Sequence, residues 1–250
     1  VTSSSGLPSF DLTGFSEFII SIFGDRVAGI LHTTNDETGD RTIATTGDIR
    51  LVYGEEKIIE ELLGLKFEIS MKSFFQTNPK SAEKLYTKVI EYALDKKEAI
   101  DNTIVLDLFC GTGTIGQLLA SKSENVQIVG VDMEESAILN ARENAERNNI
   151  KGVKFHAADV GKFLQEHQEY AGKIRTLILD PARSGVAPKT MKKIINLNAD
   201  RMVYVSCNPA TQARDLEILA DAGYKIKKFS LVDQFPHTSH VECVVLLELK

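Results

Sequence analysis

The sequence predicts an α/β fold, in which a mostly parallel sheet carries helices on both faces. Over residues 73–250, short β-prone runs alternate with segments of helical periodicity. Acidic or thiol side chains follow several of these runs. The composition, 43% hydrophobic and 26% charged, is ordinary for a globular chain. It excludes a disordered chain, a collagen and a disulfide scaffold.

Residues 1–72 are predicted to form a small β-rich domain. Its β-prone runs are separated by segments with turn-forming Gly, Asp or Asn residues at 24–25, 35–40 and 47–48. The runs lie at 18–23, 27–32 and 49–53. Residues 55–69 predict a hairpin that turns at Gly64, although part of this segment also fits a helix.

Residues 73–250 are predicted to form the second domain, in which strands and helices alternate. Asn78-Pro79 starts its first helix, because a capping residue precedes proline at the first helical position. The predicted strands are 104–109, 126–131, 154–156, 176–179, 202–205, 225–232 and 242–249. The further helices are 113–120, 134–149, 189–196 and 211–222. Ligands of such sheets bind beyond the carboxyl ends of the strands.

Polar side chains stand at five of these strand ends, and we expect them to meet along one edge of the sheet. They are Asp107, Asp132, Asp159, Asp180 and Cys207. Any single Asp could instead be a helix cap or a turn residue. That alternative is weaker for four Asp residues at successive strand ends.

The segment that starts at Asp107 contains Gly111, Gly113 and Gly116 and matches the G-x-G-x-x-G pattern of dinucleotide-binding turns. A pyrophosphate at this turn would meet Asp107, and two like charges about 4 Å apart repel by about 4 kcal/mol at an effective dielectric of 20. S-adenosylmethionine carries a sulfonium and an ammonium group and no phosphate, so it suits acidic strand ends. Asp132 is then placed for its ribose hydroxyls. An NAD-dependent dehydrogenase stays an alternative.

Several motifs in order carry a family resemblance that runs from about Phe67 to the end. Asp107-Leu108-Phe109-Cys110-Gly111-Thr112-Gly113 resembles the first motif of class I methyltransferases. The other motifs resemble the RNA uracil-5-methyltransferase family, which makes 5-methyluridine. They are Phe74-Phe75-Gln76-Thr77-Asn78, Asp180-Pro181-Ala182-Arg183, Ser206-Cys207-Asn208-Pro209 and Pro236-His237-Thr238-Ser239-His240-Val241-Glu242. The run from Cys207 to Asp215 looks more like the 23S ribosomal-RNA branch than the transfer-RNA branch.

The resemblance implies a Rossmann-like, mostly parallel seven-stranded sheet and a covalent mechanism. Cys207 would be the nucleophile that adds to C6 of uracil, and Glu242 the base that removes the C5 proton. The helix that starts after Cys207 is expected to favour the thiolate and so lower the pKa of the thiol. A buried packing thiol is the alternative for Cys207 and the expectation for Cys110 and Cys243.

The resemblance also implies the other site residues. The cofactor-binding residues would be Gln76, Phe109, Gly111, Gly113, Asp132, Asp159 and Asp180. Phe74 and Asp180 would contact the target base, with core packing as the alternative for Phe74. His237 and His240 are expected to shape the loop before Glu242 and not to bind a metal. The residues after Asp180 argue against methylation of an exocyclic amine or of cytosine C5, since neither an aromatic residue nor a Cys stands there.

RNA is the expected partner, with no membrane and no obligate protein partner. The net charge of −6 gives no basic footprint, and residues 1–72 hold 6 basic and 12 acidic side chains. Relatives usually carry an upstream RNA-binding β-barrel, and many carry a four-cysteine iron–sulfur segment; neither is visible in this chain. The three cysteines form no CxxC pair and suit a reducing, cytoplasmic compartment. A non-catalytic fragment that binds S-adenosylmethionine is the rival hypothesis.

Overall fold

The computed structural model describes residues 1–5, 10–36, 49–71, 73–94, 103–123 and 126–250. The described residues do not include the predicted turn segments at 37–40 and 47–48. They also do not include residue 72, the end of the first predicted domain. The chain divides into two compact units. Unit 1 comprises Val1–Glu60 and Glu68–Ser73, and unit 2 comprises Glu61–Phe67 and Phe74–Lys250.

Unit 1 contains a small sheet of order β1-β2-β3. Its strands are β1 (Thr2–Ser3), β2 (Gly29–Thr34) and β3 (Ile49–Gly54). β1 is parallel to β2, and β2 is antiparallel to β3. The strands predicted at 27–32 and 49–53 are confirmed.

The strand predicted at 18–23 is wrong, because these residues belong to helix α1 (Leu12–Phe23). Asp11 caps this helix, and its side-chain oxygen accepts a hydrogen bond of 2.9 Å from the main-chain N–H of Gly14. Phe and Ile favour strands only weakly, so a capped first turn can outweigh their preference.

The hairpin predicted over 55–69 is confirmed as β4 (Lys57–Leu62) and β5 (Leu65–Ser70). Leu63 and Gly64 form its turn with φ values of 50° and 88°, as a two-residue type I′ turn requires. Within unit 2, the N–H of Leu63 donates to the Glu83 carboxylate at 3.0 Å. The side chain of Asn148 makes two hydrogen bonds of 2.8 Å with the main chain of Lys66. These bonds hold the turn end of the hairpin within unit 2.

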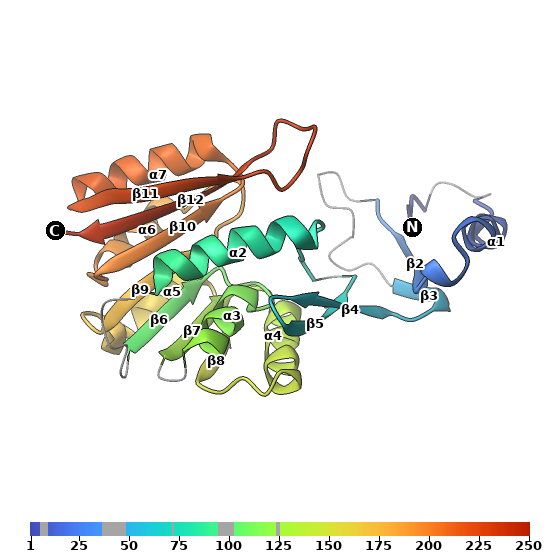
Figure 1. The fold of residues 1–250 in the computed structure, drawn as a ribbon, viewed down its shortest axis with the longest axis horizontal. Coiled ribbons are helices and arrows are strands. Elements are labelled where there is room, and N and C mark those ends of the chain that lie inside the picture. The colour runs from blue at the N-terminus through green and yellow to red at the C-terminus, as the bar shows by residue number, and fades with distance from the viewer. Residues whose placement is uncertain (6–9, 37–48, 72, 95–102, 124–125) are drawn as a thin grey trace. The chain divides into compact units, whose positions relative to one another are not determined.

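Unit 2 is built on a sheet that has seven strands among the described residues, in the order β11-β12-β10-β9-β6-β7-β8 (Figure 1). Neighbouring strands are parallel except at β12, which is antiparallel to both of its neighbours. The strands are β6 (Thr103–Leu108), β7 (Val126–Asp132), β8 (Val153–Ala157), β9 (Ile174–Leu179), β10 (Arg201–Ser206), β11 (Tyr224–Val232) and β12 (Glu242–Leu249). The mostly parallel sheet and each of its predicted strands are confirmed.

Helices cover both faces of this sheet (Figure 1). They are α2 (Pro79–Ala93), α3 (Thr114–Lys122), α4 (Glu135–Arg147), α5 (Val160–Glu166), α6 (Pro188–Ile195) and α7 (Pro209–Asp221). Asn78 caps α2, and Pro79 is its first residue, as predicted. Helix α5 is only 7 residues long and was not among the predicted helices.

Two apolar clusters hold the layers together. Met202 and Tyr204 of β10 pack with residues of α5, α6 and α7, whereas Val203 and Val205 pack with residues of α2 and α3. Successive residues of a strand point to opposite faces, so a strand covered on both sides is apolar along most of its length. The helices cover both faces of the sheet, so polar residues of the strands are expected at the carboxyl ends of the parallel strands.

Candidate active site

The five predicted strand-end residues lie along one edge of the large sheet, because β6 to β10 are mutually parallel. Asp107 lies in β6 and Asp132 is the last residue of β7. Asp180 and Cys207 directly follow β9 and β10, and Asp159 lies two residues beyond β8. The predicted convergence of these residues at one edge is confirmed.

The turn after β6 adopts left-handed backbone conformations at Phe109, Gly111 and Gly113, with φ values of 63°, 52° and 69°. This conformation is uncommon for an aromatic residue and marks local strain. A Cβ atom on Gly111 would meet nothing within 4 Å, whereas one on Gly113 would lie 2.5 Å from the Phe155 ring. The turn is therefore packed at Gly113 and open at Gly111.

Two carboxylates support this turn. Asp132 accepts hydrogen bonds of 2.9 Å from the main-chain N–H groups of Gly111 and Glu134. Asp107 is fully buried, and its Oδ2 accepts a hydrogen bond of 3.1 Å from the N–H of Gly116. Its Oδ1 has no hydrogen-bond partner in the described part of the chain. Burial raises the pKa of Asp107 to about 7, with Asp132 adding to the effect and the Gly116 N–H opposing it.

Asp159 and Asp180 lie in different surroundings. Asp159 is exposed and caps α5, accepting a hydrogen bond of 2.9 Å from the N–H of Lys162. The contact observed for Asp159 is therefore that of a helix cap, which is the alternative to a binding role, and its role in cofactor binding stays a prediction. Burial raises the pKa of Asp180 well above its usual range, and the Glu242 and Asp107 carboxylates add to this.

Cys207 and Glu242 lie at the same end of two paired strands. β10 and β12 are antiparallel neighbours in which Ser206 stands opposite Cys243. One step further along this register leads to Cys207 on one strand and Glu242 on the other. Cys207 is partly exposed and Glu242 is 4% exposed. Cys207 is thus no buried packing residue, whereas Cys243 and Cys110 pack against apolar clusters as expected.

The expectation of a lowered pKa for Cys207 is wrong for the chain by itself. Burial raises the pKa of this thiol, and the Glu242 and Asp180 carboxylates raise it further, while the Arg183 guanidinium lowers it. Helix α7 does begin just after Cys207, with Asn208 as its cap. A helix N-terminus is worth only about 0.3–1 kcal/mol at most sites, so burial and two carboxylates outweigh it.

Tyr86 of α2 is a residue near this acidic group that the sequence analysis missed. Burial raises its pKa, and Asp180, Glu242 and Asp107 all add to the effect. Tyr86 directly follows Leu85 inside the predicted helix, where packing is the ordinary explanation for a Tyr, so the sequence carried no signal for it. Burial also raises the pKa of Glu242, and Arg183 opposes this effect.

The segment before α2 shows one exposed and one buried side chain. Phe74 is 75% exposed, so the core-packing alternative is wrong for it, while Gln76 is 7% exposed. Asn78 and Gln234 exchange side-chain-to-main-chain hydrogen bonds of 3.3 and 3.2 Å. The Ser81 hydroxyl donates to the main-chain carbonyl of Asp233 at 2.7 Å. These bonds tie this segment to the chain that leads into Glu242.

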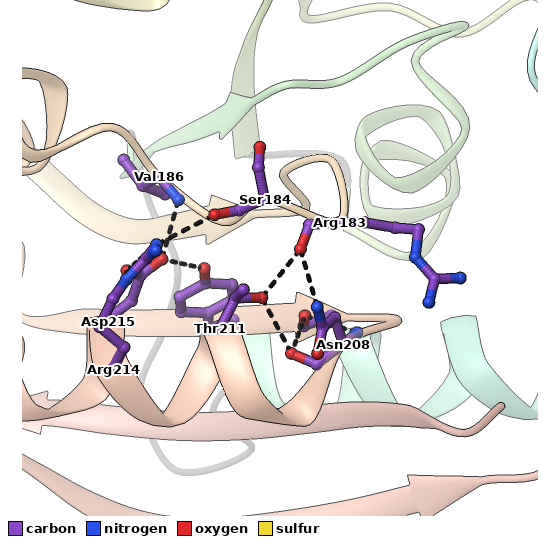
Figure 2. A network of polar contacts seen from close by, with 9 residues as sticks. Arg183, Ser184, Val186, Asn208, Thr211, Arg214 and Asp215 are labelled. Atoms are coloured by element: carbon purple, nitrogen blue, oxygen red, sulfur yellow. Dashed lines mark hydrogen bonds and ion pairs between the residues drawn. The ribbon is translucent and has the colours of Figure 1, made fainter. Parts of the chain in front are cut away.

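The loop after β9 is held by the first half of α7 (Figure 2). Asp215 of α7 is fully buried, and its Oδ2 accepts hydrogen bonds from the Tyr204 hydroxyl at 2.6 Å and the Val186 N–H at 2.8 Å. Its Oδ1 accepts from the Arg214 guanidinium at 2.7 and 2.9 Å. Arg214 also donates to the main-chain carbonyl of Ser184 at 3.0 Å. The sequence carried no signal for this network, because only the fold brings its members together.

His240 contributes to the loop before Glu242, as expected. Its N–H donates to the Thr238 hydroxyl at 3.1 Å, and its ring lies edge-on to Phe235. Among the described residues, no group of three or more His, Cys, Asp or Glu side chains is arranged to hold a metal ion. No helix of the described ranges has the length and apolar character needed to cross a membrane.

Comparison with known proteins supports this picture. The chain is 47% identical over 243 residues to an uncharacterized RNA methyltransferase of Clostridium acetobutylicum, covering 96% of this chain and 51% of that protein. A second such protein, from Caldanaerobacter subterraneus, is 45% identical over 226 residues, covering 90% of this chain and 48% of the relative. The chain therefore spans about half the length of the curated relatives it matches.

Solved structures give the same result. The Pyrococcus abyssi tRNA (uracil-54, C5)-methyltransferase, in complex with S-adenosyl-L-homocysteine, is 33% identical with a TM-score of 0.74. The alignment covers 98% of this chain and 55% of that chain. An S-adenosylmethionine-dependent methyltransferase from Agrobacterium tumefaciens is 16% identical with a TM-score of 0.62, covering 88% of this chain and 77% of that one. This second likeness shows the fold alone, which is that of class I methyltransferases.

The family profile described as tRNA (uracil-5-)-methyltransferase matches residues 42–250. This range includes the glycine turn, Cys207, Glu242 and the loop that α7 holds. The chain belongs to the tRNA (uracil-5-)-methyltransferase family, which is the RNA uracil-5-methyltransferase family that its motifs resemble.

Proposed function

We propose that this chain transfers a methyl group from S-adenosylmethionine to C5 of a uridine in structured RNA. The observation that supports this best is the pairing of β10 with β12, in which Ser206 stands opposite Cys243. The two residues next to this pair, Cys207 and Glu242, supply a thiol and a carboxylate at one end of the sheet. Family membership supports the same reaction.

In the proposed reaction, the Cys207 thiolate adds to C6 of uracil and forms an S–C6 bond, and the C5=C6 electron pair moves onto C5 as an enolate. When bound, S-adenosylmethionine would supply the methyl group that C5 takes up, with its methyl–sulfur bond broken and S-adenosylhomocysteine as the leaving group. Glu242 then takes the C5 proton, the double bond re-forms, and the thiolate leaves. The raised pKa of Glu242 makes its carboxylate a stronger base for this proton. In this proposal Phe74 stacks on the base, and Asp180 contacts the uracil edge or the cofactor.

The turn after β6 fits a cationic cofactor. Gly111 borders open space, and Asp107 presents a buried oxygen without a hydrogen-bond partner among the described residues. In their ionised form, the Asp107 and Asp132 carboxylates would attract a sulfonium and an ammonium group and would repel a pyrophosphate. The residues that would hold the cofactor are Gln76, Phe109, Gly111, Gly113, Asp132, Asp159 and Asp180.

The test uses RNA that contains 5-fluorouridine together with labelled S-adenosylmethionine. Fluorine at C5 cannot leave as a proton, so a denaturant-resistant protein–RNA adduct should accumulate. Cys207→Ser should form none, while Cys243→Ser, which changes a packing thiol, should retain it. With ordinary uridine, Glu242→Gln should lower product release at least about 100-fold, since general bases contribute roughly 10²–10⁴-fold. An adduct formed by Cys207→Ser would overturn the assignment of the nucleophile.

The same assay separates the rival hypotheses. A catalytically incomplete fragment would bind S-adenosylhomocysteine but form no adduct with any RNA. A dehydrogenase would bind NADH more tightly than S-adenosylhomocysteine, which calorimetric titration of both ligands measures. Tighter binding of NADH would contradict the electrostatic argument at Asp107.

Ribosomal RNA is the substrate that we propose, on the run from Cys207 to Asp215. Transfer RNA is the second candidate, because the 33% identical solved structure is a tRNA methyltransferase. Methylation assays with 23S ribosomal RNA and with bulk transfer RNA distinguish the two. Methyl transfer to transfer RNA alone would overturn the ribosomal proposal. A cytoplasmic location and a separate β-rich domain over residues 1–72 stay predictions.

A further inference from the structure

The loop after β9 brings a cation to an edge that is otherwise acidic. Asp107 and Glu242 are buried there, and Asp180 is partly buried. Arg183 is exposed. Figure 2 shows this side chain extending away from the polar network that surrounds its main chain. Its charge lowers the pKa of both Glu242 and Cys207.

The main chain of Arg183, in contrast, is firmly bonded. Its carbonyl oxygen accepts hydrogen bonds from the Asn208 side-chain amide at 3.1 Å and from the Thr211 hydroxyl at 3.0 Å (Figure 2). Asn208 directly follows Cys207, so the carbonyl of Arg183 is fixed to the residue next to the thiol. Asp215 and Arg214 hold the two following residues of the loop, as described above. The position of Arg183 is thus set by α7 and not by its own side chain.

Three charged groups act on the Cys207 thiol, and each comes from a different element. Glu242 belongs to β12, Asp180 directly follows β9, and Arg183 belongs to the loop. The two carboxylates disfavour a thiolate, and the guanidinium favours it. We propose that Arg183 is the residue that stabilises the thiolate of Cys207, held beside it through its main-chain carbonyl by Asn208 and Thr211. The proposal rests on the proposed role of Cys207 as nucleophile.

Because the main chain makes the hydrogen bonds, charge and position can be separated by mutation. Arg183→Gln removes the charge and keeps the carbonyl that Asn208 and Thr211 bind. Arg183→Lys keeps the charge. Thr211→Val keeps the charge and removes one hydrogen bond to the carbonyl. Lys122→Gln is the matched control. It removes an exposed charge at the last residue of α3, a helix of 9 residues whose first residue directly follows the glycine turn after β6.

The experiment measures the rate at which iodoacetamide alkylates Cys207 in the full chain between pH 6 and 10, with the modified cysteine identified by mass spectrometry. Arg183→Gln should shift the profile to higher pH and lower the rate at pH 7.5 by about three- to tenfold, since one pKa unit is tenfold in thiolate. Arg183→Lys should restore at least half of the lost rate. Thr211→Val should lower the rate less than Arg183→Gln does, and Lys122→Gln should change it less than about twofold.

An unchanged pH profile in Arg183→Gln would overturn the proposal. A wild-type rate in Thr211→Val would overturn the part that assigns the position of Arg183 to the hydrogen-bonded carbonyl. The readout needs neither RNA nor cofactor, so it is independent of the adduct assay. An adduct in Cys207→Ser would instead overturn the proposed function and leave the alkylation result intact.

Discussion

The carboxyl ends of β6 and β9, two neighbouring strands, are followed by segments that are held in different ways. The turn after β6 depends on left-handed backbone conformations at Gly111 and Gly113, and one hydrogen bond joins its Gly111 N–H to the Asp132 carboxylate. The loop after β9 is held from outside, by the buried Asp215 of α7. The first arrangement leaves space at Gly111, whereas in the second a Cβ atom on Gly185 would lie 2.6 Å from the Asp215 carboxylate. Room for a ligand thus comes from missing side chains, whereas rigidity beside the thiol comes from a buried polar network.

The largest expected effect comes from breaking the external support. Asp215→Ala removes the acceptor for the Tyr204 hydroxyl, the Val186 N–H and the Arg214 guanidinium at once. Breaking such a buried network costs about 3–5 kcal/mol of unfolding free energy. Urea unfolding followed by circular dichroism measures it. Asp221→Ala, at the last residue of the same helix, is the control and should cost less than about 1 kcal/mol. A loss below 1 kcal/mol in Asp215→Ala would show that the loop does not depend on α7.

A matched pair of glycine substitutions tests the turn after β6. Both Gly111→Ala and Gly113→Ala place a Cβ in the left-handed region, which costs about 1 kcal/mol each. Gly113→Ala also drives that Cβ to 2.5 Å from Phe155, so we expect a total of about 2–4 kcal/mol. Gly111→Ala should keep most of the stability but weaken binding of S-adenosylhomocysteine, because its Cβ enters the open space. Urea unfolding and calorimetric titration measure the two effects, and equal stability losses would contradict the difference in packing.

The last effect concerns Asp107 and depends on pH. Its pKa is about 7 in the folded chain, above its ordinary value of 3.8, so the folded state keeps a proton that the unfolded state releases. Stability therefore falls as pH rises from about 4 to about 7. Asp107→Asn does not titrate, and we expect it to be about 4 kcal/mol more stable than the unmodified chain at pH 8 and nearly equal at pH 4. Urea unfolding at both pH values checks this, and a variant that is less stable at pH 8 would contradict the assignment.

Much of unit 2 was predictable because its signals are local. The cap at Asn78-Pro79, the glycine turn and the apolar strands each need only neighbouring residues to be recognised. The strand predicted at 18–23 is wrong because the helix that Asp11 caps continues through these residues. Helix α5 was missed because 7 residues show too little periodicity to be recognised.

In the candidate site, too, some features could be predicted from the sequence and others could not. The residue types and their places at strand ends were readable from the sequence, and the parallel sheet then aligned them. The surroundings of each residue were not readable. The helix after Cys207 suggested a lowered pKa, but the carboxylates that raise it come from other strands. Tyr86 and Asp215 carried no signal, because a Tyr or an Asp in a helix has an ordinary local explanation.

By itself, the order of residues determined the α/β class, the run of strands and helices in unit 2, and the set of chemical groups at one edge of the sheet. These depend on local periodicity and on caps, which act over a few residues. The tertiary structure alone decided which charged groups shift one another's pKa and how deeply each is buried. It also decided that α7 holds the loop that contains Arg183. Electrostatic energies and burial depend on distances between residues remote in sequence, and only the folded chain sets those distances.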